Sequence, residues 1–534
     1  MFSQLKILYE NRKQLLGFIS SDADGSSFYF FVVNSITEKL VTSQKYEAAN
    51  AKELLNEIPT LKDLFKAIII DLFEMDLSTT HYKISYTFCE KLRELLNHCN
   101  ILHYFISEET HLFTCFLIAA KIDIKFEETV LMIITYQKKY TPKFIGLKIG
   151  EFKFTPAGYQ LVHYKDIATS DVKASPELLR RQICDGLSCS DTPQNVIVSS
   201  YRCKKVPFKK IFKTSKNFIM LNEEIRGFLM KALAEECKWL CDKSYIKYHI
   251  LPSFDRSLCV YGCFGTEKHI MDILKININE PLPFTKTTFF PKGVPHIEYE
   301  SRLSKFCNVI KLPSDCHGIE IAVTVDEENF EKIDLSKLYF HSFEKIPLKL
   351  NSLLKSKIPF IGFYDNSSVI AINEKSNGYE FLKEWNGMYG IDCFISFDEK
   401  KPKFGKEAME VLSTKNTFVV FDLIKIMSMP PNDIKTDQCW GFKFTKDCNN
   451  PVLLQFNNFD GKIKEASPAF LMALFLRQHL KAIQAKNDGE KPKEIAIWIK
   501  KLKFNAEEYQ RVQEGISKSC ELLQIDCFFF DVEI

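Results

Sequence analysis

Cysteine and histidine are the residues of this chain that could bind a metal ion. The chain has 17 Cys and 11 His. The pairs Cys237/Cys241 and Cys259/Cys263 are each spaced so that both thiols would lie on one face of a helix. The common zinc sites need two tight pairs at a set spacing, and no second pair follows either of these. We therefore expect no metal site, and we expect the cysteines to be mostly buried small apolar groups.

A hydrolytic enzyme would need a nucleophile held beside a base, or a glycine-rich phosphate loop. The sequence contains no Gly-x-Ser-x-Gly elbow, no His-Glu-x-x-His pair and no Walker-type loop, and its histidines are scattered. An unrelated hydrolase therefore remains only a third alternative, and metal-dependent turnover would be needed to support it.

The charge balance argues against nucleic acid and membrane surfaces as partners. The chain has 71 basic and 68 acidic residues, a net charge of +3, so it has no long-range field to attract polyanions. No uncharged apolar run approaches the roughly 18 residues of a membrane span. Residues 1–10 lack the apolar core of a secretion signal. We expect a cytoplasmic protein with reduced thiols.

Apolar patterns predict the elements that must position any functional residue. Amphipathic helices are predicted at 82–96, 222–237 and 468–484. Strands mixed with such helices indicate α/β layers. Residues 276–325 have strand-like runs without a helical pattern and predict an all-β module. Runs rich in β-branched and aromatic residues predict strands at 28–33, 67–71, 130–136, 196–200, 319–325, 358–363, 369–372 and 527–532.

An internal repeat relates residues 67–109 to residues 495–533. Ile68 and Ile70 match Ile495 and Ile497 at a constant offset of 427 positions (495 − 68), and Glu-Leu-Leu at 94–96 matches 521–523 at the same offset. Both copies read as strand, loop, helix and strand. One offset kept across a strand and a helix favours duplication over chance.

Residues 361–534 resemble the heat-shock protein 70/110 chaperone superfamily. Ile-Gly-Phe-Tyr-Asp-Asn-Ser-Ser-Val-Ile-Ala-Ile at 361–372 is similar to the opening strand, phosphate loop and strand of that family's nucleotide-binding domain. Phe-Gly-Lys-Glu-Ala at 404–408, Lys-Asn-Thr at 415–417 and Ser-Pro at 467–468 follow in the family's order. The resemblance implies the first lobe of an actin-like ATPase.

Two further segments carry the same resemblance. Residues 68–119 are the other copy of the repeat, and Ile-Ser-Glu-Glu-Thr at 106–110 is similar to an acidic turn before a helix. Residues 258–263 resemble the last helix of the nucleotide-binding domain, and 280–290 resemble the start of the β-sandwich substrate-binding domain.

The implied fold is α/β, with actin-like (ribonuclease-H-like) lobes flanking a β-sandwich. The implied domains are a degenerate nucleotide-binding-like domain at 1–266, a sandwich at 267–345, and a second, partial nucleotide-binding-like domain at 355–534.

The resemblance also implies where ATP would bind. In this family, backbone amides of glycine-containing hairpin turns surround the phosphates. The C-terminal loop has Asp365, Asn366, Ser367 and Ser368 where the family has an Asp-x-Gly-Thr-Thr pattern. Asn can adopt the left-handed backbone, so the turn can persist. The magnesium-side Asp aligns with Tyr364, or with Asp365 after a slip of one residue.

Other implied ATP contacts have been replaced. The catalytic Lys aligns with Asp422, with Lys425 nearby, and a carboxylate there would repel the γ-phosphate. The second phosphate loop would lie within 133–140, which has no glycine. The adenosine loop aligns with 248–253, where Pro252 removes an amide donor.

The N-terminal copy has a looser counterpart of the phosphate loop. Asp24, Gly25, Ser26 and Ser27 follow Asp22 and could form it. A plain surface turn explains the same residues.

We therefore expect a polypeptide- or chaperone-binding protein with a vestigial ATPase, whose partners are polypeptide clients or a heat-shock-70-type chaperone. Phe284, Phe289, Phe290 and Ile297 of the sandwich could line a peptide groove, or form its core. The alternative is an ATP-binding co-chaperone that promotes nucleotide exchange, for which ATP would be the cofactor.

Overall fold

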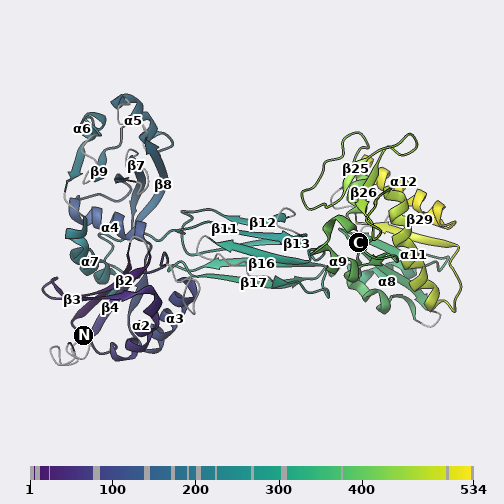
Figure 1. Ribbon diagram of the computed structural model, residues 1–534, viewed down its shortest axis with the longest axis horizontal. Coiled ribbons are helices and arrows are strands. Elements are labelled where there is room, and N and C mark those ends of the chain that lie inside the picture. The colour runs from purple at the N-terminus through teal and green to yellow at the C-terminus, as the bar shows by residue number, and fades with distance from the viewer. Residues whose placement is uncertain are drawn as a thin grey trace.

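The protein has a mixed α/β structure in three parts. The computed structural model describes residues 5, 13–22, 25–75, 85–137, 145–169, 175–188, 192–199, 206–222, 225–265, 270–301, 310–374, 377–500 and 504–530. Figure 1 shows a two-lobed module at the N-terminal end, a β-sandwich in the middle and a third lobe at the C-terminal end. Within the described ranges, no helix is long and apolar enough to cross a membrane.

The first lobe is a five-stranded sheet with helices on one face. The apolar side chains of the strands pack against helices α2 (Ala51–Glu57) and α3 (Ser85–His98). The strands are β1 (Leu15–Ser21), β2 (Ser27–Asn34), β3 (Leu40–Glu47), β4 (Phe65–Asp71) and β5 (His103–Phe105).

The second lobe repeats this arrangement. Helices α5 (Pro176–Cys184) and α6 (Phe208–Ile211) cover one face of its sheet. Its strands are β6 (Thr129–Gln137), β7 (Ile145–Thr155), β8 (Gly158–Thr169), β9 (Asn195–Ser199) and β10 (Asn217–Leu221).

Two exchanged helices join the lobes. Helix α4 (Glu108–Ala120) begins after the last strand of the first sheet, where the Ser107 hydroxyl caps it by accepting from the Thr110 amide at 3.2 Å. It packs on the second sheet. Helix α7 (Leu229–Cys241) follows the second sheet and packs on the first. Each lobe therefore buries a helix that follows the other lobe's strands.

The C-terminal lobe has a third sheet of the same kind. Helices α11 (Pro468–Lys486) and α12 (Ala506–Leu522) cover one face, and α8 (Ile346–Leu353) covers the other. The main strands are β18 (Phe360–Tyr364), β19 (Ser367–Glu374), β20 (Gly378–Phe381), β28 (Glu494–Ile499) and β29 (Asp526–Phe529).

A segment inserted between β20 and β28 adds short strands and two helices. The short strands are β21 (Ile391–Asp392), β22 (Ile395–Ser396), β23 (Lys403–Phe404), β24 (Val419–Val420), β25 (Lys443–Thr445), β26 (Leu453–Asn457) and β27 (Ile463–Ala466). The helices are α9 (Lys406–Leu412) and α10 (Leu423–Ser428).

All three sheets share one topology. Numbered by order within each lobe, the strands lie 3-2-1-4-5, with the first three antiparallel and the fourth and fifth parallel to the first. The predicted repeat falls on the fourth strand, the helix and the fifth strand of the first and third sheets. Ile68 and Ile495 both face the helix that follows their strand, whereas Ile69 and Ala496 both face the opposite side. The constant offset therefore preserves the buried faces as well as the elements.

The central module is a sandwich of two sheets with a common core. One sheet has the order β12-β11-β14-β15 and the other β13-β16-β17. Alternate residues of β16, such as Ile319 and Ile321, are buried against the facing sheet. The strands are β11 (Leu258–Cys263), β12 (Ile270–Ile276), β13 (Phe284–Pro291), β14 (His296–Ser301), β15 (Ile310–Lys311), β16 (Gly318–Val325) and β17 (Glu331–Leu338).

Three sequence-based expectations are corrected here. Residues 258–263, expected to form the last helix of a nucleotide-binding domain, form β11, which pairs antiparallel with both β12 and β14. The expected boundary between 266 and 267 falls inside the β11–β12 hairpin, so the β module begins at Leu258. The predicted helix at 222–237 begins only at Leu229, after a 3-10 turn.

Both ends of the sandwich are docked. Phe330, from the turn between β16 and β17, inserts into the first lobe, where its ring centroid lies 5.3 Å from that of Phe73 and 4.9 Å from that of Phe105. At the other end, Phe264 stacks on Phe421 of the C-terminal lobe at 5.6 Å. The sandwich thus separates the N-terminal module from the third lobe (Figure 1).

Candidate functional site

The predicted C-terminal phosphate loop is the hairpin turn between β18 and β19. Tyr364 pairs with Ser367 across it, leaving Asp365 and Asn366 as the turn residues. The left-handed backbone falls on Asp365, with φ +45°, and not on Asn366 as expected. Asp, like Asn, tolerates this conformation better than most residues. The turn therefore persists without glycine.

The two serines after this turn are buried and already hydrogen-bonded. Ser367 is 3% exposed and its hydroxyl donates to the Asp392 carboxylate. Ser368 is fully buried, and its hydroxyl lies 2.9 Å from Nε2 of His479 and 3.2 Å from the indole nitrogen of Trp385. Because both hydroxyls are engaged inside the lobe, neither is available to a phosphate.

His479 and Ser368 have the spacing of a base and a nucleophile, but their setting is structural. Nδ1 of His479 lies 3.1 Å from the Phe475 carbonyl, which can only accept, so Nδ1 carries the proton. Burial lowers the pKa of His479 to about 3, and the neutral ring accepts at Nε2 from Ser368. Both side chains are fully buried, at 0% exposure. A substrate cannot reach the pair, and we assign it a packing role.

The position of the expected catalytic lysine is acidic and also engaged. The Asp422 amide donates to the Asn366 side-chain oxygen at 3.0 Å, and its carboxylate accepts from the Trp440 indole at 2.9 Å. Burial raises the pKa of Asp422. The nearby Lys425 binds Asp437 at 2.8 Å. This turn therefore faces a buried carboxyl group, which does not fit ATP.

The other face of the C-terminal sheet is covered by the chain itself. In the N-terminal module, the equivalent face is covered by α7, which follows the strands of the second lobe. In the C-terminal lobe, α8 and the turn before it occupy that place. The residues of this packed face include Phe343, Ile346, Leu350, Phe360, Val369 and Trp498. A partner lobe therefore cannot insert a helix there as the two N-terminal lobes do.

The predicted N-terminal loop is the corresponding β1–β2 turn. The amide of Gly25, with φ +71°, donates to the Asp22 carbonyl at 3.0 Å, and the Ser27 hydroxyl donates to the Asp22 carboxylate at 2.9 Å. Ser27 is buried and Ser26 is exposed. Asp24 lies outside the described residues. These contacts are those of an ordinary tight hairpin turn.

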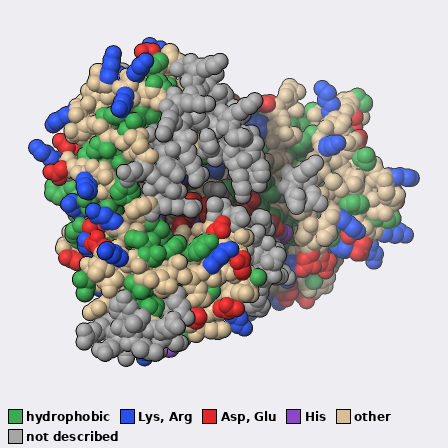
Figure 2. All heavy atoms as spheres, turned by 60° about the vertical axis from the view of Figure 1, so that its left-hand side comes forward, with side chains coloured by type: hydrophobic (Ala, Val, Ile, Leu, Met, Phe, Trp, Pro, Cys, Tyr) green, Lys and Arg blue, Asp and Glu red, His purple; other side chains and the backbone are tan. Residues whose placement is uncertain are grey.

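Carboxyl groups gather where the first lobe faces the second. Asp71 ends β4 and Glu108 begins α4, so both lie at the edge where the parallel strands end. Burial, reinforced by the charge of Glu108, raises the pKa of Asp71 to about 8. Lys148, from β7, pairs with Glu109 at 2.5 Å. Figure 2 shows acidic side chains at the hollow between the lobes. The raised pKa keeps Asp71 largely protonated near neutral pH, so this edge presents a buried neutral carboxyl group.

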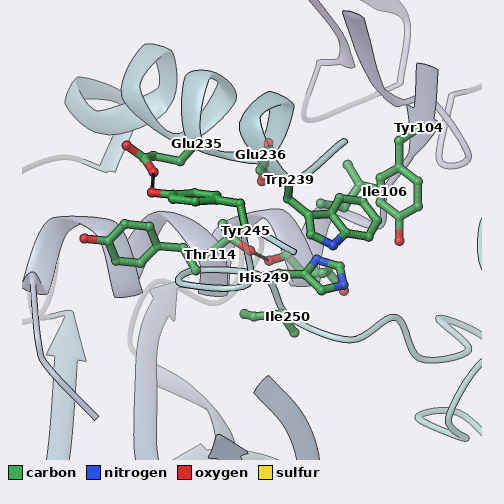
Figure 3. Close-up of a pocket in the computed structure, with 11 residues that line it drawn as sticks. Tyr104, Ile106, Thr114, Glu235, Glu236, Trp239, Tyr245, His249 and Ile250 are labelled. Carbon is green, nitrogen blue, oxygen red and sulfur yellow. Dashed lines mark hydrogen bonds between the residues drawn. The ribbon is translucent and has the colours of Figure 1, made fainter. Parts of the chain in front are cut away.

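The segment expected to bind adenosine closes a small cavity instead. Tyr248, His249 and Ile250 line it together with α4 and α7 (Figure 3). His249 stacks on Trp239 with ring centroids 3.7 Å apart. The cavity volume is about 20 Å³, which is the space of about one water molecule. It cannot hold a nucleoside. The second expected phosphate loop lies partly outside the described residues, which include only 133–137 of it.

Sequence reasoning missed the side chains that form hydrogen bonds with the two serines of the C-terminal loop. Asp392 and His479 lie 25 and 111 residues from the serines that they contact. No motif connects residues so far apart, and only the pairing of β19 with β21 and the packing of α11 bring them together.

Comparison with known proteins gives no assignment. No known family model matches the chain. A search of curated proteins also finds no match.

Proposed function

We propose that this chain is a degenerate relative of the heat-shock protein 70/110 chaperones that binds polypeptides or a chaperone partner without effective ATP hydrolysis. The resemblance of its motifs, in the family's order, is the starting point. The common topology of the three lobes and the position of the sandwich between them support actin-like lobes flanking a substrate-binding-like module. The described cysteines, none of which is joined to another by a disulfide, agree with a cytoplasmic setting.

One observation carries the proposal against ATP chemistry. The hydroxyls and the turn that would hold phosphate in the C-terminal lobe are bonded to His479, Asp392 and the backbone of Asp422. Freeing them would leave buried polar groups unsatisfied, at about 1–3 kcal/mol for each group. The lobe is therefore stabilised in a form that excludes the phosphate.

Strand β13 lies at an edge of the sandwich, as do β17, β12 and β15. Phe290 and Ile297, two of the four residues considered for a groove, are only 7% and 1% exposed and belong to the core. Phe289 is 60% exposed on β13, which is an edge strand. An extended segment can add to such an edge through main-chain hydrogen bonds, with an exposed aromatic ring as its side-chain contact. We place polypeptide binding at β13.

The test is a holding assay with the full chain and a chemically denatured enzyme. We expect the chain to suppress aggregation equally with and without Mg-ATP. Phe289→Asp should reduce the suppression, whereas Phe528→Asp, at a 50% exposed residue of β29, should not.

Nucleotide effects would contradict this proposal. A rise in melting temperature with Mg-ATP would favour the ATP-binding co-chaperone, because a ligand of the folded state stabilises it. If Phe289→Asp suppresses aggregation as well as the wild type does, β13 is not the polypeptide-binding surface. That result would not bear on whether the chain binds ATP.

A further inference from the structure

Three metal-ligating side chains meet on the outer face of the sandwich. Cys263 ends β11, and His296 and Glu298 lie at the start of β14. Their ligand atoms all lie within 4.8 Å of one another, and Nε2 of His296 is 3.3 Å from Oε1 of Glu298. We propose that Cys263, His296 and Glu298 bind a zinc ion.

Strand pairing creates this cluster from residues far apart in the sequence. β11 and β14 are antiparallel, with Cys263 directly opposite His296. Glu298 is two residues further along β14, so it points to the same face as His296. Gly262 and Ile297, which pair with each other between these positions, face the core. A rigid two-strand frame thus presents all three side chains on one side.

The donor set suits zinc. A thiolate, an imidazole nitrogen and a carboxylate oxygen are its usual protein ligands, and three of them leave a fourth position for water. Zinc–ligand bonds of about 2.0–2.3 Å in a tetrahedron place ligand atoms roughly 3.3–3.8 Å apart. The His296–Glu298 distance already meets this, and small side-chain rotations close the rest. Magnesium and calcium, which prefer oxygen ligands, fit less well.

The partial burial of the three side chains favours binding of a metal ion over a solvent-exposed ion pair between His296 and Glu298. Cys263 is only 6% exposed, and the side chains of His296 and Glu298 are 19% and 23% exposed. Partial burial concentrates the field of the two anionic ligands on a cation. Cys263 must lose its proton on binding, so one thiol proton is released for each ion bound.

The site lies beside the junction with the C-terminal lobe. Phe264, next to Cys263, stacks on Phe421. On the β14 side, the ammonium of Lys292 donates to the carbonyls of Tyr389 and Gly390. An ion that joins the ends of β11 and β14 would fix both docking loops. We therefore assign the zinc a structural role in holding the sandwich to the lobe.

Metal titration of the full chain tests the proposal. The metal-free protein is titrated with Co²⁺, whose thiolate complexes absorb in the near ultraviolet, and the ion is then displaced with Zn²⁺ in the presence of a chromophoric chelator. We expect each chain to bind one Co²⁺ through a thiolate and to exchange it for one Zn²⁺. Cys263→Ser and His296→Asn should each weaken Zn²⁺ binding more than about 100-fold, beyond the effect of groups that merely support a ligand. Zn²⁺ should raise the melting temperature of the wild type but not of these two variants.

A matched control separates this site from the other thiols. Cys259 lies on the same face of β11 but pairs with Glu300. Cys259→Ser should therefore leave both the near-ultraviolet cobalt–thiolate absorption and the affinity for Zn²⁺ unchanged. Equal binding by wild type and Cys263→Ser would overturn the proposal, as would the absence of a cobalt–thiolate band. His296→Asn alters a partly exposed side chain, so it provides a second test if Cys263→Ser proves unstable.

Discussion

Replacing His479 by Gln should change how the stability of the C-terminal lobe responds to acid. The imidazole is fully buried and neutral, between the Phe475 carbonyl and the Ser368 hydroxyl. Gln is similar in length and can accept one hydrogen bond, but it does not titrate. The variant therefore removes one titrating group while leaving most of the packing in place.

The expected size follows from the pKa of His479, which burial lowers from 6.5 to about 3 in the folded protein. The unfolded chain takes up a proton below pH 6.5 that the folded lobe refuses, so stability is full above that pH and falls as the pH drops toward 3. This group alone should remove about 2 kcal/mol between pH 7 and pH 5, and about 4 kcal/mol between pH 7 and pH 3. Because the imidazole of His479 is fully buried, screening by solvent does not reduce these free energies.

Urea unfolding followed by tryptophan fluorescence measures the effect. A Trp239→Phe background leaves Trp385, Trp440 and Trp498, which all lie in the C-terminal lobe. At pH 7 the Gln variant should be less stable by about 1–3 kcal/mol, from the altered buried hydrogen bonds. By pH 5 that deficit should shrink by about 2 kcal/mol.

The control for this experiment is His341→Gln, since the His341 side chain is 84% exposed. This control should follow the wild-type pH dependence. Parallel pH profiles for the wild type and His479→Gln would refute the burial argument, and with it the view that the Ser368–His479 bond holds Ser368 inside the lobe.

Three further substitutions test the packing at other positions. Arg256→Met leaves two carboxylates without their buried partner and should destabilise the chain by about 3–5 kcal/mol in chemical denaturation. Phe330→Ala should lose about 3–5 kcal/mol and expose the junction with the first lobe to protease, whereas Phe289→Ala should change stability little. Gly390→Ala would place a methyl group 2.1 Å from a backbone oxygen and should yield little folded protein. Gly461→Ala, whose methyl group meets open space, should lose only the roughly 1–2 kcal/mol that its left-handed backbone (φ +76°) costs an alanine, and should still fold.

Much of the fold could be predicted because the apolar residues that each helix or strand buries recur along the sequence with the period of that element. The continuous apolar run of Ile68 to Ile70 and its copy at Ile495 to Ile497 are confirmed as central strands buried on both faces. Residues 258–263 were assigned wrongly because family resemblance outweighed their own pattern. Leu258 and Val260 alternate with less buried neighbours, which is the period of a strand.

The sites were less predictable, because each joins residues that only the fold brings together. The zinc ligands proposed here come from β11 and β14, which are separated by two further strands, so neither proposed partner of Cys263 lies near it in the sequence. The serines of the predicted phosphate loop could be picked out from the resemblance, but their internal partners could not. What a hydroxyl binds depends on packing, and a resemblance aligns residues without their packing.

The absence of nucleotide binding that we propose would follow from the architecture of the third lobe, because α8 caps its sheet. In the N-terminal module, two lobes are joined by exchanged helices and face each other across a hollow lined with carboxyl groups. In the C-terminal lobe, the same sheet face is filled by Ile346 and Leu350 of a helix that follows the sandwich. Asn366→Gly combined with Asp422→Lys would therefore not supply an opposing lobe. This double variant should remain unchanged in melting temperature on addition of Mg-ATP, and a clear rise would mean that a single lobe suffices to bind the nucleotide.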